Sequence, residues 1–220
     1  MPLDVDLSIL PSAQRSLWPE LRNVPREFVL YGGTAVALRL AHRISVDFDF
    51  FASSQFDPFE LRRSLGTLGE GLVLQSRPNT LTLILDRAGE VKLSLFGGIA
   101  GRAGSPDETT DGVICAASVL DLLAHKLKVI LQRAESRDYR DIAALLRSGV
   151  AFDRGLGAAA TLFAPGFPIA ECMKALTYFQ DIAEPSRLST RDRDLLVAAV
   201  KDVASDIPTV PLASRALNSA

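Results

Sequence analysis

The chain has 220 residues, of which 48% are hydrophobic and 23% charged, which is the composition of a globular protein long enough to bury a core. Its formal net charge of −2 excludes a surface that is basic throughout, so a nucleic-acid partner would have to be held by a local basic patch. With only two histidines and two cysteines, a zinc site built from nitrogen and sulfur ligands is nearly excluded.

The beginning of the chain alternates between expected helices and expected strands. A short helix over 12–22 ends before Pro25, and the aromatic and β-branched run at 27–31 predicts a buried strand. Two glycines then precede residues 34–41, whose high helix propensity predicts a helix. Strict alternation of apolar and polar residues over 45–52 predicts the next strand.

Residues 57–98 continue this pattern. Asp57 and Pro58 open a helix that extends to residue 68, because proline favours the first helical position. Three strand-like runs follow between 72 and 98, separated by Pro-Asn and Ala-Gly turns. We therefore expect an α+β fold in which helices flank a mixed β-sheet.

The pattern changes in the loop at 97–112, which is rich in glycine and acidic residues and is expected to be a flexible connector. No strand pattern appears after residue 115, and the tail from residue 205 is expected to be loosely held. Amphipathic periodicity predicts helices over 118–133, 136–148, 152–163, 168–181 and 189–204. We place a domain boundary in the loop, so that 1–110 form an α/β domain and 111–220 a helical domain.

Asp47 and Asp49 are the first candidate functional residues. Residues i and i+2 of a strand point to the same face, so both carboxylates face one way, while Phe48 and Phe50 face the core. Two convergent carboxylates suit Mg²⁺, which takes oxygen ligands and keeps waters and substrate phosphates for its other positions. The alternative is a half-buried strand with a polar outer face.

The turn Gly32-Gly33-Thr34 is the second candidate. Glycines permit a tight turn and close approach of the backbone to a ligand, and the N-terminus of the following helix is an anion site. Thr34 caps this helix or offers its hydroxyl to a phosphate; the alternative is a plain capped turn. The spacing matches neither a P-loop nor a dinucleotide-binding motif.

A single short helix joins the glycine turn to the aspartate strand, so the two features are expected to lie on neighbouring strands. The first would then hold the triphosphate and the second the metal that bridges it. Arg43 and Ser45 precede the aspartates and are expected to reach the same phosphates, since a guanidinium binds phosphate with two parallel hydrogen bonds.

The segments YGGTAVAL and HRISVDFDFF resemble the AbiEii/AbiGii toxin family, within the polymerase-β-like nucleotidyltransferase superfamily. The resemblance continues in LDLLAHKLKVILQRAESRDYRDIAALL and covers residues 27–147. It implies a polymerase-β-like core followed by a helical domain that completes the active site. It also implies that Gly33 and Thr34 hold phosphates and that Asp47 and Asp49 bind the metal.

Three later residues are assigned through the same resemblance. Lys126 matches a helical lysine that contacts the nucleotide, and Asp138 or Asp141 matches a later acidic position. Helical spacing agrees in part, because Lys126 and Arg133 share a face and the two aspartates are i, i+3 neighbours. The alternative is structural, with Asp138 complementing the N-terminus of its own helix.

One position departs from the superfamily pattern. Polymerase-β-like enzymes place a third carboxylate on a later strand beside the first two, and the run VKLSLF at 91–96 carries Ser94 there, with Lys92 on the same face. Three explanations stay open: a single Mg²⁺ suffices, Asp138 or Asp141 supplies the missing oxygen, or catalysis is lost.

The resemblance implies a Mg²⁺-dependent nucleotidyltransferase that moves a nucleoside monophosphate from an NTP to an acceptor hydroxyl. It further implies that the acceptor is a tRNA 3′ end and that the protein is a bacterial toxin with an antitoxin partner. Two alternatives are an enzyme acting on a small molecule or a protein, and a nucleotide-binding or interaction protein that has lost catalysis. Short apolar runs and an acidic N-terminus predict a cytoplasmic protein without a membrane partner.

Overall fold

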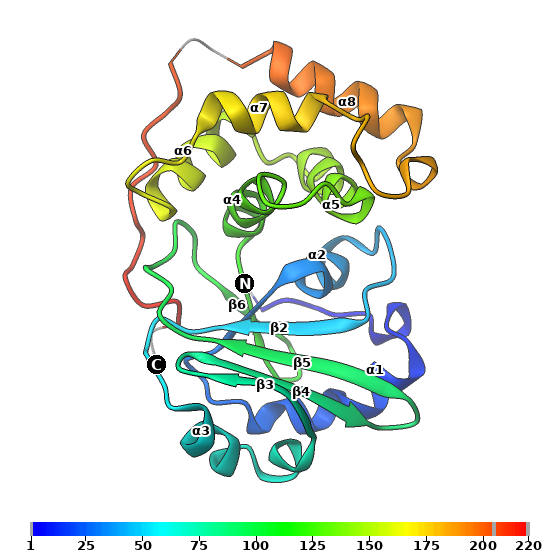
Figure 1. The fold of residues 1–220 in the computed structure, drawn as a ribbon, viewed down its shortest axis with the longest axis vertical. Coiled ribbons are helices and arrows are strands. Elements are labelled where there is room, and N and C mark those ends of the chain that lie inside the picture. Colours follow the sequence, from blue (N-terminus) through cyan, green and yellow to red (C-terminus); the bar gives the residue numbers. More distant parts are fainter. Residues whose placement is uncertain (1, 204–205, 219–220) are drawn as a thin grey trace.

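The computed structural model describes residues 2–203 and 206–218 (Figure 1). In this part of the chain, seven strands form one sheet in the order β3-β4-β5-β2-β1-β7-β6. The strands are β1 (Val29–Tyr31), β2 (Asp47–Phe51), β3 (Leu72–Arg77), β4 (Thr80–Asp86), β5 (Glu90–Phe96), β6 (Asp107–Glu108) and β7 (Cys115–Ala116). The sheet mixes parallel and antiparallel pairs, which confirms the expected α+β class with a mixed sheet.

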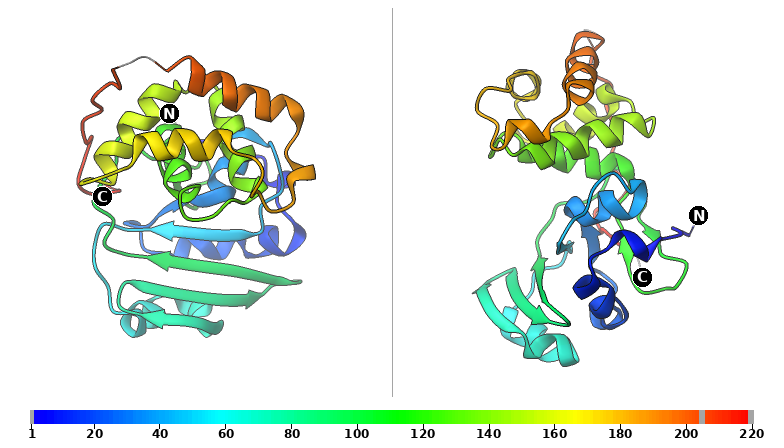
Figure 2. Two further views of the ribbon diagram at one scale, coloured as in Figure 1. Left: turned by 45° about the horizontal axis from the view of Figure 1, so that its top comes forward. Right: turned by 90° about the vertical axis from the view of Figure 1, so that its right-hand side faces the viewer.

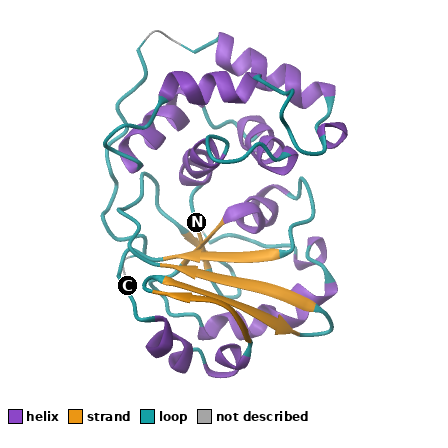
Figure 3. Cartoon of the chain, viewed as in Figure 1, coloured by secondary structure: helices purple, strands orange, loops and turns teal. Residues whose placement is uncertain are grey.

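Helices surround this sheet (Figure 3). The described α-helices are α1 (Ser12–Leu17), α2 (Gly32–Leu40), α3 (Pro58–Ser64), α4 (Val119–Val129), α5 (Ser136–Arg147), α6 (Phe152–Leu162), α7 (Ile169–Thr177) and α8 (Thr190–Lys201). Short 3₁₀ segments are η1 (Leu7–Ile9), η2 (Trp18–Asn23), η3 (Gly66–Glu70) and η4 (Pro185–Arg187). Every helix expected from the sequence is present, although several end earlier than expected.

The centre of the sheet brings β1, β2 and β5 side by side. β1 runs antiparallel to β2, with Tyr31 opposite Asp49. β2 runs parallel to β5, with Lys92 opposite Asp47 and Ser94 opposite Asp49. Residues paired across neighbouring strands point to the same face, so the expected position of Lys92 and Ser94 beside the aspartates is confirmed.

The two faces of the sheet differ in polarity because apolar and polar side chains alternate along its central strands. Phe48 and Phe50 of β2 and Leu93 and Leu95 of β5 are all buried on one face. Trp18 packs on this face, with its ring centroid 6.3 Å from that of Phe48. The opposite face carries Asp47 and its partners. Apolar burial on the first face therefore fixes which residues the second face presents.

The later helices gather on the polar side of the central strands. Figure 1 shows α2 between the strands and the pair α4 and α5, with α6, α7 and α8 beyond them. Both views in Figure 2 show the helices of the C-terminal part, coloured yellow to orange, together on one side of the sheet. The proposed boundary at residue 110 stays a prediction, and β7, just past it, pairs with β1 in the sheet.

Three expectations for the loops were wrong. The segment 97–116 contains β6 and β7, which are two residues long and too short to show alternation. The loop at 97–112 is held to the helices and is not the flexible connector that was expected. The Asp121 carboxylate accepts hydrogen bonds from the backbone N–H groups of Ala103 and Gly104. The described tail is not loose, because Leu217 is 1% exposed and its N–H donates to Ser53 Oγ at 2.8 Å.

In the ranges that the structure describes, no helix is both long enough and apolar enough to cross a membrane. Cys115 and Cys172 are both free thiols. Cys172 is buried in the helical part, where burial raises the pKa of its thiol to about 12. Neither cysteine therefore contributes a cross-link to the fold.

Candidate active site

A cavity of about 370 Å³ lies where the polar face of the sheet meets α4 and the start of α2. Its floor comes from strands β2, β4 and β5, and its far wall from α4 and the turn after it. The residues that line it are Tyr31, Gly32, Gly33, Arg43, Ser45, Asp47, Asp49, Phe51, Gln75, Thr82, Lys92, Ser94, Phe96, Leu122, His125, Lys126, Val129, Arg133 and Arg137. This size is in the usual range for a small-molecule site.

The carboxylates of Asp47 and Asp49 both face this cavity, as the alternation of β2 predicted. Burial raises the pKa of the Asp49 carboxyl, and the neighbouring charge of Asp47 raises it further. Lys92 and a hydrogen bond with Ser94 offset part of this rise. Asp49 is thus a carboxylate whose charge is incompletely neutralised by the protein, which favours a cationic ligand.

Lys92 is the nearest cation to this pair. Its Nζ lies 3.0 Å from Asp47 Oδ2, and both side chains are partly exposed to the cavity. Lys92 projects from β5, the strand on which a third carboxylate was expected. The strand therefore carries an uncharged side chain, Ser94, at the position where a carboxylate was expected, and a positive charge at Lys92 two residues earlier.

The glycine turn forms the edge of the cavity opposite the carboxylates. Gly32 has φ +69°, a conformation that glycine adopts without strain, and a Cβ there would lie 2.8 Å from Asp49 Oδ2. A Cβ on Gly33 would collide with the Arg43 guanidinium. Since no side chain caps α2, its first N–H groups remain available at the cavity. The glycines make room for the site's own side chains as well as for a ligand.

Thr34 lies apart from the cavity. It is 1% exposed, and its hydroxyl donates to the backbone carbonyl of Asp47. Tyr31, not Thr34, occupies the N-cap position of α2, so Thr34 is not the cap that the sequence suggested. In this geometry Thr34 ties α2 to β2 and has no path to a phosphate.

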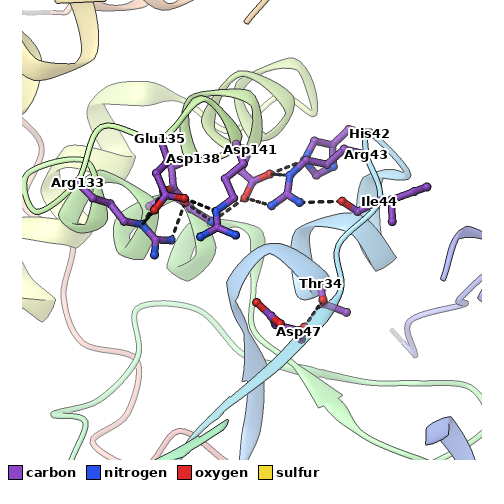
Figure 4. A network of polar contacts seen from close by, with 11 residues as sticks. Thr34, His42, Arg43, Ile44, Asp47, Arg133, Glu135, Asp138 and Asp141 are labelled. Carbon is purple, nitrogen blue, oxygen red and sulfur yellow. Dashed lines mark hydrogen bonds and ion pairs between the residues drawn. The ribbon is translucent and has the colours of Figure 1, made fainter. Parts of the chain in front are cut away.

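A buried cluster of charges joins the helices to the segment between α2 and β2 (Figure 4). Asp141 of α5 accepts from Arg43 Nε at 2.6 Å and from Arg43 Nη2 at 2.8 Å. His42 Nε2 lies 2.6 Å from Asp141 Oδ1, and Lys126 Nζ lies 2.6 Å from Asp141 Oδ2. Burial alone would raise the pKa of Asp141, but these neighbours together lower it well below its usual range.

Asp138, one turn before Asp141, belongs to the same cluster. It accepts from Lys126 Nζ at 2.8 Å and from Arg133 Nε at 2.9 Å (Figure 4). Burial opposes its ionisation, yet Lys126 and Arg133 lower its pKa below the ordinary value. Helix α4 ends at Val129, and the tight turn that follows carries Arg133 to Asp138.

The structure brings most of the predicted site residues together. Seven of them line the cavity: Gly32, Gly33, Arg43, Ser45, Asp47, Asp49 and Lys126. Asp138 and Asp141 do not line it, because their carboxylates are fully buried against cations. These aspartates act here through Lys126 and Arg43, whose head groups they fix at the cavity wall. They do not replace the missing third carboxylate in this arrangement.

Sequence reasoning did not assign the aromatic residues of the cavity. Phe51 is the next member of the series that contains Asp47 and Asp49, so period-2 alternation was a usable signal. Phe96 stands in the same relation to Ser94. His125 and Arg137 gave no comparable signal, because their positions depend on how the helices pack on the sheet.

A second cavity of about 490 Å³ adjoins the first. The two share walls formed by Arg43, Ser45, Asp47 and Arg137. The remaining wall residues are Ile44, Val46, Glu135, Ser136, Arg140, Ala183, Glu184 and Arg187. Asp47 therefore stands at the junction of two adjoining spaces.

The oxygen ligands in the first cavity fit one divalent cation. Asp47 and Asp49 offer carboxylate oxygens, and a hard cation such as Mg²⁺ completes its shell with waters and phosphate oxygens. Among the described residues, no group of three or more histidine, cysteine, aspartate or glutamate side chains is placed to hold a metal. The protein's own contribution to a metal site is thus the aspartate pair.

An uncapped helix N-terminus faces two carboxylates across one cavity, so one side of the cavity suits an anion such as a phosphate and the other suits a divalent cation. Residues 20–199 match the family described as "Nucleotidyl transferase AbiEii toxin, Type IV TA system". The chain belongs to this AbiEii family of nucleotidyltransferase toxins, which confirms the resemblance seen in the sequence.

Two further proteins are similar to the chain. An uncharacterized protein of Aquifex aeolicus (strain VF5) is 33% identical over 123 residues, which are 55% of this chain and 58% of that protein. The alignment thus spans a little over half the length of this relative. MenT4, a nucleotidyltransferase toxin of Mycobacterium tuberculosis H37Rv, has a similar fold, with a TM-score of 0.59 at 16% identity over 87% of this chain and 82% of its own.

Proposed function

We propose that this protein transfers a nucleoside monophosphate from an NTP to an acceptor hydroxyl in a Mg²⁺-dependent reaction. The observation that carries the proposal is the convergence of the α2 N-terminus with Asp47 and Asp49 on one cavity. The hydroxyl oxygen bonds to the α-phosphorus, the bond to the pyrophosphate oxygen breaks, and the hydroxyl proton leaves to water. Pyrophosphate is released.

Each part of the cavity has a defined role in this reaction. The first N–H groups of α2 hold triphosphate oxygens, assisted by the N–H groups of Arg43 and Lys126 that are not bound to Asp138, Asp141 or the Ile44 carbonyl. Asp47 and Asp49 hold Mg²⁺, which when bound offsets the negative charge of the phosphates. Ser45 lies beside Gly33 and extends the polar wall. Catalysis then rests on positioning and on charges fixed before the reaction.

The acceptor is proposed to approach through the second cavity, which meets the first at Asp47. Arg137, Arg140 and Arg187 line this space, in which Glu135 pairs with Arg137 and Glu184 pairs with Arg187. Ile44 and Val46 are exposed beside it, at 67% and 54%. Cationic and apolar side chains together suit a single-stranded RNA end, and we propose a tRNA 3′ end.

The family description supports two further parts of the proposal. The family consists of toxins of type IV toxin–antitoxin systems, so we propose that this protein is a toxin whose partner is an antitoxin protein. We also propose that it acts in the cytoplasm, where NTPs and tRNA are present.

The test is to incubate the protein with each labelled NTP, Mg²⁺ and either total tRNA or a cell extract. Label on tRNA that disappears in the Asp47→Ala/Asp49→Ala variant supports the proposal. Label on a small molecule or a protein would identify a different acceptor for the same chemistry. Binding of NTP without transfer would support a nucleotide-binding protein that has lost catalysis. A double variant as active as the wild type would place the active site elsewhere.

A further inference from the structure

The floor of the first cavity changes in character along strands β2 and β5. Their parallel register pairs Asp47 with Lys92, Asp49 with Ser94 and Phe51 with Phe96. All six side chains line the cavity. The floor is therefore a charged row, a polar row and an aromatic row, in that order.

The aromatic row is continued by the walls at its end of the cavity. The Phe51 and Phe96 ring centroids are 5.0 Å apart, with an angle of 31° between the rings. Phe51 also meets Tyr31 at 5.2 Å and His125 at 5.8 Å, and the rings of Tyr31 and His125 are 4.5 Å apart. Four aromatic rings from four elements, β1, β2, β5 and α4, thus meet at one end of the space.

The aromatic rings at this end of the cavity carry no charge at pH 7. His125 is half-buried at the cavity wall, and desolvation lowers its pKa to about 4, so its ring is neutral at pH 7. Its Nε2 atom is buried without a hydrogen-bond partner in the described part of the chain. Leu122, Lys126 and Val129 of α4 also line the cavity. The surroundings favour a flat, uncharged group.

We propose that the nucleobase of the NTP binds in this aromatic row, stacked on Phe96 and Phe51 beneath His125. The inference rests on the proposed nucleotidyl transfer and adds where the base of the substrate lies. Strand geometry puts the aromatic row about 13 Å from the charged row, a separation that a nucleotide spans from its phosphates to its base. The polar row between them, with Thr82 and Gln75 at its margin, faces the sugar.

The proposal separates two parts of binding that can be measured independently. Inorganic triphosphate has the phosphates of an NTP and no base. A residue that holds the base affects NTP binding and leaves triphosphate binding unchanged. A residue of the charged row affects both.

The experiment is calorimetric titration of full-length protein with Mg²⁺ and either inorganic triphosphate or an α,β-methylene NTP, which cannot transfer its nucleotide. Phe96→Ala is expected to weaken NTP binding about tenfold or more and to leave triphosphate binding unchanged. Asp49→Ala is expected to weaken both. Phe59→Ala, which removes a 65% exposed ring on α3, is the control and is expected to change neither.

Unfolding of the Phe96→Ala variant is checked by its melting temperature, and Phe96→Leu replaces it if it is unstable. Leucine keeps apolar volume without a flat ring, so it is expected to lose NTP affinity selectively as well. Equal losses for both ligands, or no loss for either, would overturn the base site. A wild-type protein that binds NTP more tightly than triphosphate but transfers nothing would overturn the proposed reaction and leave the base site standing. A wild-type protein that binds neither ligand would overturn both.

Discussion

Two pairs of aspartates in this protein have opposite environments. Asp47 and Asp49 of β2 face a cavity, and among the residues that the structure describes only Lys92 forms an ion pair with them. Asp138 and Asp141 of α5 are fully buried and each contacts at least two cationic groups. The pKa of Asp49 is raised mainly by burial. The pKa of Asp141 is lowered despite burial, because the side chains of Lys126, His42 and Arg43 stabilise its charged form.

The difference shows how one residue type serves binding in one region and structure in another. Asp47 and Asp49, the strand pair, have carboxylate charges that the protein neutralises incompletely, which is the property of a cation site. Asp138 and Asp141, the helix pair, have their charges neutralised by cationic side chains of the protein. They position Lys126 and Arg43 at the cavity wall. Four substitutions are expected to separate these two roles.

The largest expected effect is on the helix pair. Asp141→Asn leaves Arg43 and Lys126 buried without their shared counterion and is expected to lower the free energy of unfolding by about 3–5 kcal/mol. Urea denaturation at pH 7 measures it. Glu60→Gln, which removes a salt bridge whose partners are both 68% exposed, is the control and is expected to cost less than about 0.5 kcal/mol.

The pH dependence of stability tests the same substitution. The pKa of Asp141 is lower in the folded protein than the unfolded value of about 4, so its stabilisation is present above pH 4 and is lost as the pH falls below that value. The wild type is therefore expected to lose stability below pH 4 more steeply than Asp141→Asn. Parallel curves for the two proteins would contradict this account of the helix pair.

The next effect concerns the strand pair and its lysine. Lys92→Met removes a positive charge 3.0 Å from Asp47 and is expected to tighten binding of Mn²⁺, used as a probe for Mg²⁺, by about five- to tenfold. Titration calorimetry without nucleotide measures this affinity. Lys174→Met, at an exposed position on α7, should leave it unchanged. Weaker Mn²⁺ binding by Lys92→Met would mean that Lys92 supports the cation site instead of competing with the cation.

Asp49→Asn is expected to stabilise the protein. Burial and the charge of Asp47 both oppose ionisation of Asp49, so a neutral amide should raise the free energy of unfolding by about 1 kcal/mol in metal-free buffer. The same variant should lose nucleotidyl transfer. Asp47→Asn, which breaks the pair with Lys92, is the comparison and should give no gain in stability. A destabilised Asp49→Asn would remove the contrast between the two aspartate pairs.

The smallest expected effect is at the exposed edge of the helix cluster. The Arg133 side chain is 45% exposed, and Lys126 still neutralises Asp138 after Arg133→Ala. The loss of stability should therefore stay below about 1 kcal/mol in urea denaturation. A loss as large as that of Asp141→Asn would show that exposure does not set the strength of these contacts.

The strand half of the site follows from the sequence because its signals are local. Alternation alone places Asp47 and Asp49 on the face opposite Phe48, and the turn glycines precede a recognisable helix. The same rule would have found Phe51. Local periodicity fixes which way a strand residue points once one neighbour is known to be buried.

The helix half of the site depends on contacts between distant residues. Arg43 and Asp141 are 98 positions apart, and no periodicity in either segment indicates that they pair. Thr34 was misread for the same reason, since its partner is the carbonyl of a strand residue. The packing of 206–218 on the sheet also escaped prediction, because a few apolar residues among prolines carry no period.

The returning tail gives the molecule a second attachment between its layers. The chain passes from sheet to helices once, between β7 and α4, and Figure 1 shows residues 206–218 running back from the helices to the sheet. There the N–H of Arg102 donates to the Ser214 carbonyl at 2.9 Å, and Leu217 is buried. Helices held at two points have fewer rigid-body motions than helices held at one, so wide separation from the sheet first requires this segment to detach.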